Sequence, residues 1–399
     1  MSAIVPFSPP LRRRLPVPDR SVFLFGARGT GKTTFARQCD PNALVIDLRS
    51  GAMARALAGA PERLHELLDD ADAQRLVVID EIQRQPEILD IVHQRLEREP
   101  QRRFLLTGSS ARSLRRAGVN LLGGRVGRIT MPGFLACELG AAFDLNRSLR
   151  VGMLPLVCTN DNPERAIADY VTTAVFDEIR AEIALRRVEP FARALEHLAL
   201  SHAGVLSIST IAQHAGVPRS TVVQWIDVLE HMFLVARLPV FAKRPSRRAL
   251  AEHPKLYFTD TGVASALRTP LGVAAATDTS GAALEGLVYQ HLMAWCDATP
   301  GAQLSTWRTA AALEVDFVVS TPTALVAIEV KHGEHTRSAD RRGLLAFQNE
   351  YPDAHALLVS NTPIRTVHDA IIELPVRQWL TDIVPTHALP IPLGLPTAR

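Results

Sequence analysis

Short apolar runs separated by helical patterns fill the first 150 residues. Four continuous apolar runs lie at residues 21–25, 43–48, 75–80 and 104–107. Stretches with apolar residues at every third or fourth position separate these runs, most clearly at residues 86–98. Strands that are apolar on both faces and alternate with helices are typical of a parallel sheet with helices on both sides. The pattern therefore predicts an α/β domain over residues 1–150.

Helical periodicity dominates the next part of the chain. Long helical stretches lead to two shorter ones at residues 208–215 and 219–229, which are separated by a turn at Gly216. An apolar run at residues 233–238 follows. Two helices joined by a short turn and followed by a strand are typical of a winged helix-turn-helix. We therefore expect an all-α, winged-helix region over residues 151–250.

Strands and helices are mixed between residues 251 and 385, which predicts an α+β or α/β domain. The expected elements are strands at 256–259 and 356–359, helices at 284–295 and 341–350, and a hairpin of strands at 314–319 and 325–331. Residues 386–399 are rich in proline and predict a flexible tail.

The composition is that of a globular protein, with 47% hydrophobic and 21% charged residues. No apolar run approaches the roughly 20 residues of a transmembrane helix, and no long apolar segment follows the N-terminal arginines. We therefore expect no membrane partner. The four cysteines are far apart, which fits a reducing cytoplasm. The net charge of +3 does not by itself predict a nucleic-acid partner.

The sequence GARGTGKT at residues 26–33 follows the first predicted strand and opens a helix. It matches the phosphate-binding pattern G-x-x-x-x-G-K-[ST] at every required position. Loop N–H groups and the helix N-terminus attract phosphates, Lys32 reaches the β- and γ-phosphates, and the Thr33 hydroxyl holds Mg²⁺. The residues expected to contact ATP are Gly26, Ala27, Arg28, Gly29, Thr30, Gly31, Lys32, Thr33, Thr34 and Ser109.

The run RLVVIDEIQ supplies the carboxylates that such a loop requires. Asp80 ends the third predicted strand and is expected to bind the magnesium through water. Glu81 follows directly, where a carboxylate can activate the attacking water. This pair of acids favours ATP hydrolysis over nucleotide binding alone.

Two further groups are candidates for the γ-phosphate. The strand end FLLTGSS offers Thr107 and Ser109 as sensors of that phosphate. The segment GGRVGR offers Arg125 and Arg128, because the charge that develops during hydrolysis needs a cation. Either arginine could act within its own chain or across a homo-oligomer, and the alternative is an ordinary surface arginine.

These segments resemble a group of prokaryotic AAA+-like P-loop ATPases. The similarity lies in GARGTGKTTFARQ, VVIDEIQ and FLLTGSSARSLRRAGVNLLGGRV, and in MPGFLACEL, where Gly133 replaces a usually larger residue. The group carries a C-terminal domain of uncharacterised function that is similar to restriction endonucleases. The resemblance covers nearly the whole chain and implies an ATPase core, a winged-helix middle and a nuclease-like end.

The segment EVDFVVSTPTALVAIEVK carries a second candidate site. Glu329 and Lys331 are two positions apart and share one face of a strand, and the hairpin brings Asp316 beside Glu329. Two close carboxylates repel each other unless a divalent cation neutralises them, and Lys331 could orient or deprotonate a water. This pattern is typical of metal-assisted phosphodiester hydrolysis. Glu285, on the preceding helix, is a candidate fourth member.

Spacing alone does not separate this site from an ordinary ion pair on an edge strand. The family resemblance favours a nuclease-like site, with Mg²⁺ or Mn²⁺ at Glu285, Asp316 and Glu329. The winged helix leaves a similar choice between a DNA-binding unit and a spacer between proteins. For DNA contact the candidates are Arg219, Ser220, Thr221 and Gln224, with phosphate contacts from Lys243, Arg244, Arg247 and Arg248.

Two functions are consistent with these patterns. In the first, the chain binds and hydrolyses ATP and couples this reaction to a DNA-binding, metal-dependent nuclease-like module. In the second, it is a nucleotide-dependent switch or scaffold, and its C-terminal carboxylates are structural. Metal binding at Asp316 distinguishes the two.

Overall fold

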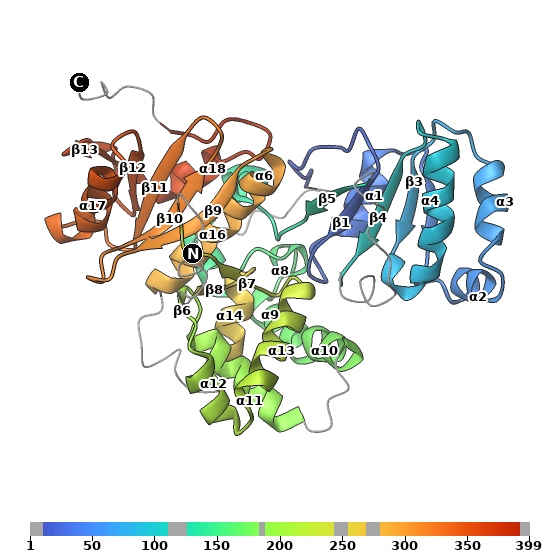
Figure 1. Cartoon of the computed structure of the whole chain (residues 1–399), viewed down its shortest axis with the longest axis horizontal. Helices are drawn as coiled ribbons and strands as arrows, with labels where there is room; N and C mark the ends of the chain where they lie inside the picture. Colours follow the sequence, from blue (N-terminus) through green and yellow to red (C-terminus); the bar gives the residue numbers. More distant parts are fainter. Residues whose placement is uncertain (1–10, 111–125, 183–187, 243–253, 269–279, 392–399) are drawn as a thin grey trace.

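The computed structural model describes residues 11–110, 126–182, 188–242, 254–268 and 280–391. Figure 1 shows three groups of elements, with the first part of the chain (blue to cyan) and the last part (orange to red) on opposite sides of the view. The middle of the chain (green to yellow) lies below and between them. Within the described residues, no helix is both long and apolar enough to cross a bilayer.

The first unit is built on a five-stranded parallel sheet, as the alternating pattern predicts. The strands are β1 (Val22–Phe25), β2 (Leu44–Asp47), β3 (Val77–Asp80), β4 (Phe104–Gly108) and β5 (Gly127–Thr130). Their order is β2-β3-β4-β1-β5, and every neighbouring pair is parallel. The sequence pattern missed β5, because this edge strand is only partly buried and lacks an apolar run.

Helices cover both faces of this sheet. Successive strand residues point to opposite sides, so alternate residues of β1 pack against different helices. Phe23 and Phe25 belong to one buried cluster, which also contains apolar side chains of α2 (Gly51–Gly59), α3 (Arg63–Asp69) and α4 (Leu89–Arg98). Val22 and Leu24 belong to a second cluster with Phe35 and Ala36 of α1 (Lys32–Cys39). Helix α2 lies where the sequence pattern predicts no element, whereas α4 lies within the helical pattern at residues 86–98.

The middle of the chain is mostly helical. Its helices are α6 (Ala136–Leu139), α7 (Leu145–Val151), α8 (Pro155–Cys158), α9 (Pro163–Asp169), α10 (Phe176–Glu182), α11 (Val188–Leu200), α12 (Ile208–Ala215), α13 (Arg219–His231) and α14 (Thr261–Arg268). A π-helical turn at Tyr170–Val175 connects α9 to α10. Helix α12 has the predicted bounds, and α13 runs two residues further.

A small antiparallel sheet accompanies α12 and α13. It consists of β6 (Gly204–Val205), β7 (Val235–Leu238) and β8 (Lys255–Phe258), in the order β6-β8-β7. Strand β8 is the strand predicted at residues 256–259. It lies in the middle of this small sheet and not in the sheet that follows.

The last unit has a six-stranded mixed sheet in the order β13-β14-β12-β11-β10-β9. The strands are β9 (Gln303–Arg308), β10 (Glu314–Ser320), β11 (Leu325–Lys331), β12 (His355–Ser360), β13 (Thr366–His368) and β14 (Ile371–Pro375). The predicted hairpin is present, because β10 and β11 are antiparallel and Phe317 lies opposite Ile328. Strands β9, β13 and β14 are additions to the elements expected from the sequence.

Helices cover both faces of this sheet as well. Helix α16 (Ser280–Ala298) and α18 (Val376–Asp382) share a buried cluster with Ile328 and Val330, while α17 (Arg342–Glu350) packs on the opposite face beside Ala327. Residues 386–391 of the predicted tail contact the first face. There, the indole N–H of Trp295 donates to the carbonyl of His387 at 2.9 Å, and that of Trp379 to Pro390 at 3.1 Å.

Candidate nucleotide and carboxylate sites

The phosphate-binding loop connects β1 to α1. Gly29 and Gly31 adopt left-handed backbone angles, with φ of 81° and 89°, which favour glycine at these positions. The Nζ atom of Lys32 donates to the carbonyl oxygens of Gly26 at 2.8 Å and Ala27 at 2.9 Å. The lysine side chain is therefore folded into the loop, and burial lowers the pKa of its ammonium.

A threonine and an aspartate meet beside this loop. The Thr33 hydroxyl lies 2.9 Å from Oδ2 of Asp80, which is almost completely buried at the end of β3. Strand β4 lies between β1 and β3, and the hydroxyl of its Thr107 donates to Asp80 and accepts from the backbone N–H of Glu81. Mg²⁺ prefers hydroxyl and carboxylate oxygens together with phosphate and water. Thr33 and Asp80 therefore fit the predicted metal position.

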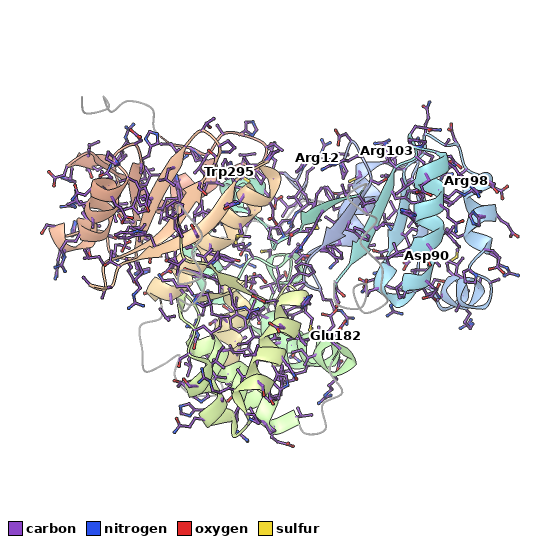
Figure 2. The ribbon with its side chains drawn as sticks, viewed as in Figure 1. Arg12, Asp90, Arg98, Arg103, Glu182 and Trp295 are labelled. Atoms are coloured by element: carbon purple, nitrogen blue, oxygen red, sulfur yellow. The ribbon has the colours of Figure 1, made fainter. Side chains whose placement is uncertain are left out.

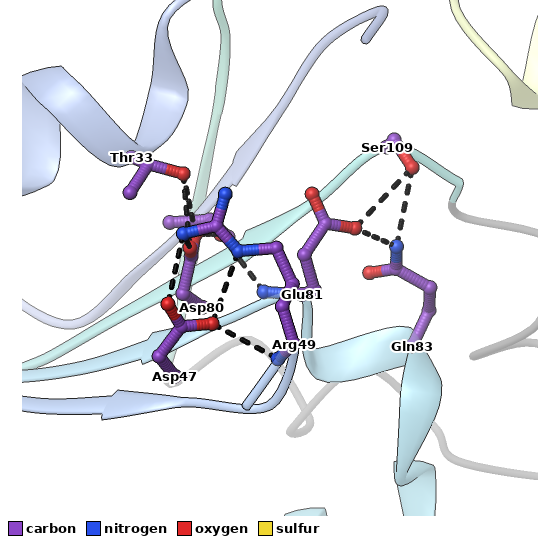
Figure 3. Close-up of polar contacts among 8 residues, drawn as sticks. Thr33, Asp47, Arg49, Asp80, Glu81, Gln83 and Ser109 are labelled. Atoms are coloured by element: carbon purple, nitrogen blue, oxygen red, sulfur yellow. Dashed lines mark hydrogen bonds and ion pairs between the residues drawn. The ribbon is translucent and has the colours of Figure 1, made fainter. Parts of the chain in front are cut away.

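Arg49 is a member of this site that the sequence analysis missed. Asp47 at the end of β2 lies opposite Asp80 in the parallel register, and Arg49 follows two residues later. The Nη2 atom of Arg49 lies 2.9 Å from an oxygen of each aspartate (Figure 3). The hydrogen bond from Arg49 lowers the pKa of the Asp47 carboxyl. A charged Asp-x-Arg at the end of the strand predicted at residues 43–48 was the available signal.

Glu81 has an unusual backbone conformation. Its φ of 61° and ψ of 49° are left-handed angles, which a residue with a Cβ adopts at a cost of about 1–3 kcal/mol. The amide of Gln83 donates to the Glu81 carboxylate and, at 3.1 Å, to the Ser109 hydroxyl (Figure 3). The local strain and these partners fix the carboxylate in one direction.

The loop, Arg49, Glu81, Gln83 and Ser109 contribute to the lining of one cavity of about 750 Å³. From the predicted set it is lined by Arg28, Gly29, Gly31, Lys32, Thr33, Thr34, Glu81 and Ser109. The Tyr170 hydroxyl donates to the carbonyl of Arg28 at 2.8 Å, and Asp177, Glu178 and Glu182 of α10 line the same cavity. Figure 2 labels Glu182 on the middle unit. Burial raises the pKa of the Glu178 carboxyl.

The remaining predicted residues of the loop have structural contacts. The Thr30 hydroxyl donates to the carbonyl of Ala27 at 2.9 Å. Of the two candidate arginines, Arg125 lies outside the described residues. The guanidinium of Arg128 lies 5.7 Å from the ring centroid of Phe25 and 5.5 Å from that of Phe233, and it lines a second cavity.

The C-terminal candidates also come together. Asp316 on β10 and Glu329 on β11 are buried, and the Nζ atom of Lys331 lies 2.6 Å from Oε1 of Glu329. The backbone N–H of Val330 donates to Oδ2 of Asp316 at 3.0 Å. Burial, together with the charge of Asp316, raises the pKa of Glu329 to about 8.

Lys255 is the member of this site that sequence reasoning missed. Its Nζ atom lies 2.8 Å from Oδ1 of Asp316 and 3.0 Å from Oε1 of Glu285 on α16. The hydroxyl of Tyr257 donates to the same oxygen of Glu285 at 2.6 Å. Burial and Asp316 raise the pKa of Glu285 to about 7. A lysine at the head of the short apolar run KLYF was the available signal.

A divalent cation does not fit the carboxylates in this arrangement. Lys255 uses the oxygens of Asp316 and Glu285 that face it, and Val330 uses the second oxygen of Asp316. Across the described parts of the chain, Oε2 of Glu329 is a buried acceptor without a hydrogen-bond partner. The same parts contain no group of three or more His, Cys, Asp or Glu residues that could hold a metal ion.

The candidate DNA-contacting residues are at the start of α13. Arg219, Ser220 and Gln224 are exposed and Thr221 is half-buried. The basic residues at 243–248 lie outside the described residues.

Comparisons with known proteins divide the chain into three matched segments. Residues 18–140 match the model of an AAA domain, residues 142–276 a domain of unknown function (DUF8612), and residues 280–379 another domain of unknown function (DUF4143). No curated protein matches the chain. Protein VC1899 from Vibrio cholerae, a solved structure, is 13% identical over 91% of this chain and 96% of its own, with a TM-score of 0.20. That score is too low to relate the two folds.

The AAA-domain match and the parallel sheet agree on the first unit. A phosphate-binding loop at the end of a parallel strand fits an α/β P-loop-like fold, and the match supports an AAA-like ATPase that uses ATP and Mg²⁺. The C-terminal unit corresponds to a domain of unknown function, so its activity has to be argued from its own residues.

Proposed function

We propose that this chain is an ATPase whose catalytic residues are Lys32, Thr33, Asp80 and Glu81. The observation that carries this proposal is that Lys32, Thr33 and Glu81 line one cavity at the carboxyl ends of β1 and β3, and that Asp80 lies 2.9 Å from the Thr33 hydroxyl. Lys32 binds the β- and γ-phosphates once nucleotide draws its ammonium away from the loop carbonyls. Glu81, held by Gln83, orients and deprotonates the attacking water.

Thr33 and Asp80 are the residues that hold Mg²⁺ in this proposal. The ion, when bound, withdraws charge from the β- and γ-phosphate oxygens. Ser109 lies beside Glu81 and faces the same cavity, which supports its role as a contact to the γ-phosphate. Arg125 remains a candidate cation for the developing charge.

The direct test is phosphate release from ATP by the full chain and by Lys32→Ala. We expect the variant to lose hydrolysis. Arg63→Ala is the matched control, because this basic residue is exposed on α3, outside the cavity. Equal phosphate release by Lys32→Ala and the wild type would exclude the proposed site.

We further propose that the ATPase acts on a DNA-binding module formed by α11–α13 and the small sheet. Two observations support this coupling. Side chains of α10 line the nucleotide cavity, and the start of α13 presents exposed polar and basic side chains. Arg219→Ala should weaken DNA binding, whereas Arg165→Ala, an exposed arginine on α9, should not. The measurement is fluorescence anisotropy of labelled duplex DNA at two salt concentrations.

For the C-terminal unit we propose metal-dependent cleavage of DNA, in a state in which Lys255 does not occupy Asp316 and Glu285. Asp316 on β10 accepts the backbone N–H of Val330, which lies between Glu329 and Lys331 on β11, and this proximity of the three side chains favours the activity. The test is plasmid nicking with ATP and with Mg²⁺ or Mn²⁺, comparing the wild type with Asp316→Ala and Lys331→Ala. No cleavage by the wild type under any combination of metal and nucleotide would reject it.

The second candidate is a nucleotide-dependent switch with a catalytically inactive C-terminal unit. The observation that favours it is Lys255, which neutralises Asp316 and Glu285 without a metal. In this case Asp316→Ala lowers the thermal unfolding midpoint and changes no activity. Calorimetric titration of Mn²⁺ separates the candidates.

A further inference from the structure

Strand β8 belongs to two hydrophobic cores at once. Leu256 and Phe258 belong to the large cluster that includes α11, α12 and α13, whereas Tyr257 belongs to the cluster of the C-terminal unit. The Tyr257 ring stacks on Tyr289 of α16, with 4.3 Å between centroids. Alternate residues of a strand point to opposite sides. Lys255 therefore points to the same side as Tyr257, into the C-terminal unit.

Lys255 arrives at the carboxylates from outside their own unit. It is 61 positions from Asp316 in the chain and its side chain is almost completely buried. Its contacts with Asp316 and Glu285 are direct hydrogen-bonded ion pairs, and Glu314, half-exposed, lies 4.0 Å away. A buried ammonium between two carboxylates occupies the place that a cation would need.

The charges in this cluster do not balance. The carboxylates of Glu285, Asp316 and Glu329 face the two ammonium groups of Lys255 and Lys331. With all three carboxyl groups ionised one negative charge is left over, and among the described atoms Oε2 of Glu329 is a buried acceptor without a partner. Close carboxylates without enough positive charge hold either a proton or an added cation. The cluster therefore has the carboxylates of a metal site, but Lys255 occupies oxygens that would bind the cation.

We propose that Lys255 is a built-in competitor for the divalent cation of this cluster. With Lys255 in place Asp316 and Glu285 do not bind Mg²⁺ or Mn²⁺, and withdrawal of Lys255 frees them to join Glu329 in a metal site. This inference rests on the metal-dependent activity proposed above, and it adds a mode of regulation. The proposed ligand of the cluster is a divalent metal ion and not a macromolecule.

The strand that carries Lys255 connects it to the rest of the chain. Strand β8 is hydrogen-bonded to β7, which follows α13, and Leu238 of β7 lies opposite Lys255. Beyond β7, the backbone N–H of Thr306 on β9 donates to Pro239 at 2.9 Å. The small sheet that carries Lys255 is therefore joined by hydrogen bonds to the C-terminal sheet.

The test is titration of Mn²⁺ into the full chain, followed by calorimetry in the absence of nucleotide. Lys255→Met should bind Mn²⁺ at least about tenfold more tightly than the wild type, because the competing ammonium is gone. The gain should disappear in Lys255→Met/Asp316→Asn, which assigns it to this cluster and not to Asp80. Lys331→Met is the matched control, since it removes the other ammonium but leaves Lys255 on Asp316. Its affinity should stay near the wild-type value.

A second variant and a second measurement guard against loss of folding. Lys255→Gln retains a hydrogen-bond donor to the carboxylates without the charge and should show the same gain. Mn²⁺ should also raise the thermal unfolding midpoint of both Lys255 variants by more than that of the wild type, by preferential binding to the folded state. Unchanged Mn²⁺ affinity and unchanged midpoints in both variants would overturn the proposal.

The outcomes also separate this proposal from the activity on which it rests. If the wild type binds Mn²⁺ as tightly as Lys255→Met and loses that binding in Asp316→Asn, the role of Lys255 is wrong and the metal site stands. If both Lys255 variants gain Mn²⁺ binding but no variant cleaves DNA, Lys255 competes with the cation as proposed and the nuclease activity is wrong. An equal gain in Lys331→Met contradicts a specific role for Lys255.

Discussion

The Nη2 atom of Arg49 lies 2.9 Å from Oδ2 of Asp80, the carboxylate that we assign to magnesium. The arginine side chain is 44% exposed, so the pair is partly screened by water. On this proposed assignment, Arg49 and Mg²⁺ compete for one carboxylate. In the C-terminal cluster Lys255 likewise forms an ion pair with Asp316, the proposed metal ligand there, although that pair is buried.

Arg49→Ala should lower the Mg²⁺ concentration that supports half-maximal ATP hydrolysis. The expected change is about two- to fivefold, because a half-exposed ion pair contributes at most about 1 kcal/mol. The measurement is the initial rate of phosphate release at saturating ATP across a range of Mg²⁺ concentrations.

Arg98→Ala is the control for Arg49→Ala. Arg98 is exposed near the end of α4, away from the nucleotide cavity (Figure 2). It should leave the Mg²⁺ requirement unchanged. A higher Mg²⁺ requirement in Arg49→Ala would show that Arg49 assists the metal and does not compete with it.

Glu81→Gln should reduce ATP hydrolysis by about 100-fold or more and leave ATP affinity nearly unchanged. A glutamine retains the hydrogen bonds to Gln83 and Ser109 but cannot accept the proton of the attacking water. Single-turnover hydrolysis and calorimetric binding of ATP measure the two effects separately. Glu87→Gln, an exposed glutamate seven residues after the last residue of β3, is the control. A parallel loss of binding and hydrolysis would indicate a structural role for Glu81.

The sequence predicts those parts of both sites whose residues lie close together in the chain. The phosphate loop, the Asp80–Glu81 pair and the hairpin with Asp316, Glu329 and Lys331 are each defined by neighbouring residues, and each lies on an element at its expected place. The parallel sheet follows from the apolar runs in the same way. Regular elements with strong periodicity are the ones that a single sequence determines best.

Arg49 and Lys255 could not be predicted, because their roles depend on strand order. Arg49 reaches Asp80 only because β2 lies beside β3 in the sheet. Lys255 reaches Asp316 only because β8 packs against the C-terminal unit through Tyr257. The local signals, an Asp-x-Arg for Arg49 and a lysine before an apolar run for Lys255, do not identify a partner so far along the chain.

Gly152→Ala should destabilise the protein strongly. Gly152 has a φ of 78°, and a Cβ there would lie 2.0 Å from Oδ1 of Asp260. That carboxylate accepts hydrogen bonds from the backbone N–H groups of Met153, Gly262 and Val263, and Asp260 directly precedes α14. Both the backbone angle and the contact oppose the side chain, so a loss of about 3 kcal/mol or more is expected in urea unfolding.

Gly59→Ala is the opposite case and serves as the comparison. A Cβ at Gly59 meets nothing within 4 Å, and this residue is helical, at the end of α2. The substitution should be neutral or stabilise the protein by up to about 1 kcal/mol, through a less flexible unfolded chain. Similar losses in the two variants would contradict the assigned contact between Gly152 and Asp260.

His291 is buried and neutral in α16, where it joins two units. Its Nε2 atom accepts the backbone N–H of Ala136 at 2.8 Å, and its Nδ1–H donates to the carbonyl of Leu287 at 2.8 Å. Burial lowers the pKa of His291 to about 4, while an unfolded chain has its usual value near 6.5. Protonation removes the acceptor that Ala136 needs.

The stability of the wild type should therefore contain a contribution from His291 that is present above pH 6.5 and is lost as the pH falls toward 4. In this range the unfolded chain binds the proton and the folded chain does not. His291→Gln keeps an acceptor for Ala136 but does not titrate. The free energy of unfolding of the wild type, relative to this variant, should fall by about 2 kcal/mol between pH 7 and pH 5, as measured by urea unfolding at each pH.

His335→Gln, at an exposed position, should follow the wild type across the same range. A constant difference between His291→Gln and the wild type would mean that His291 titrates alike in the folded and unfolded chains.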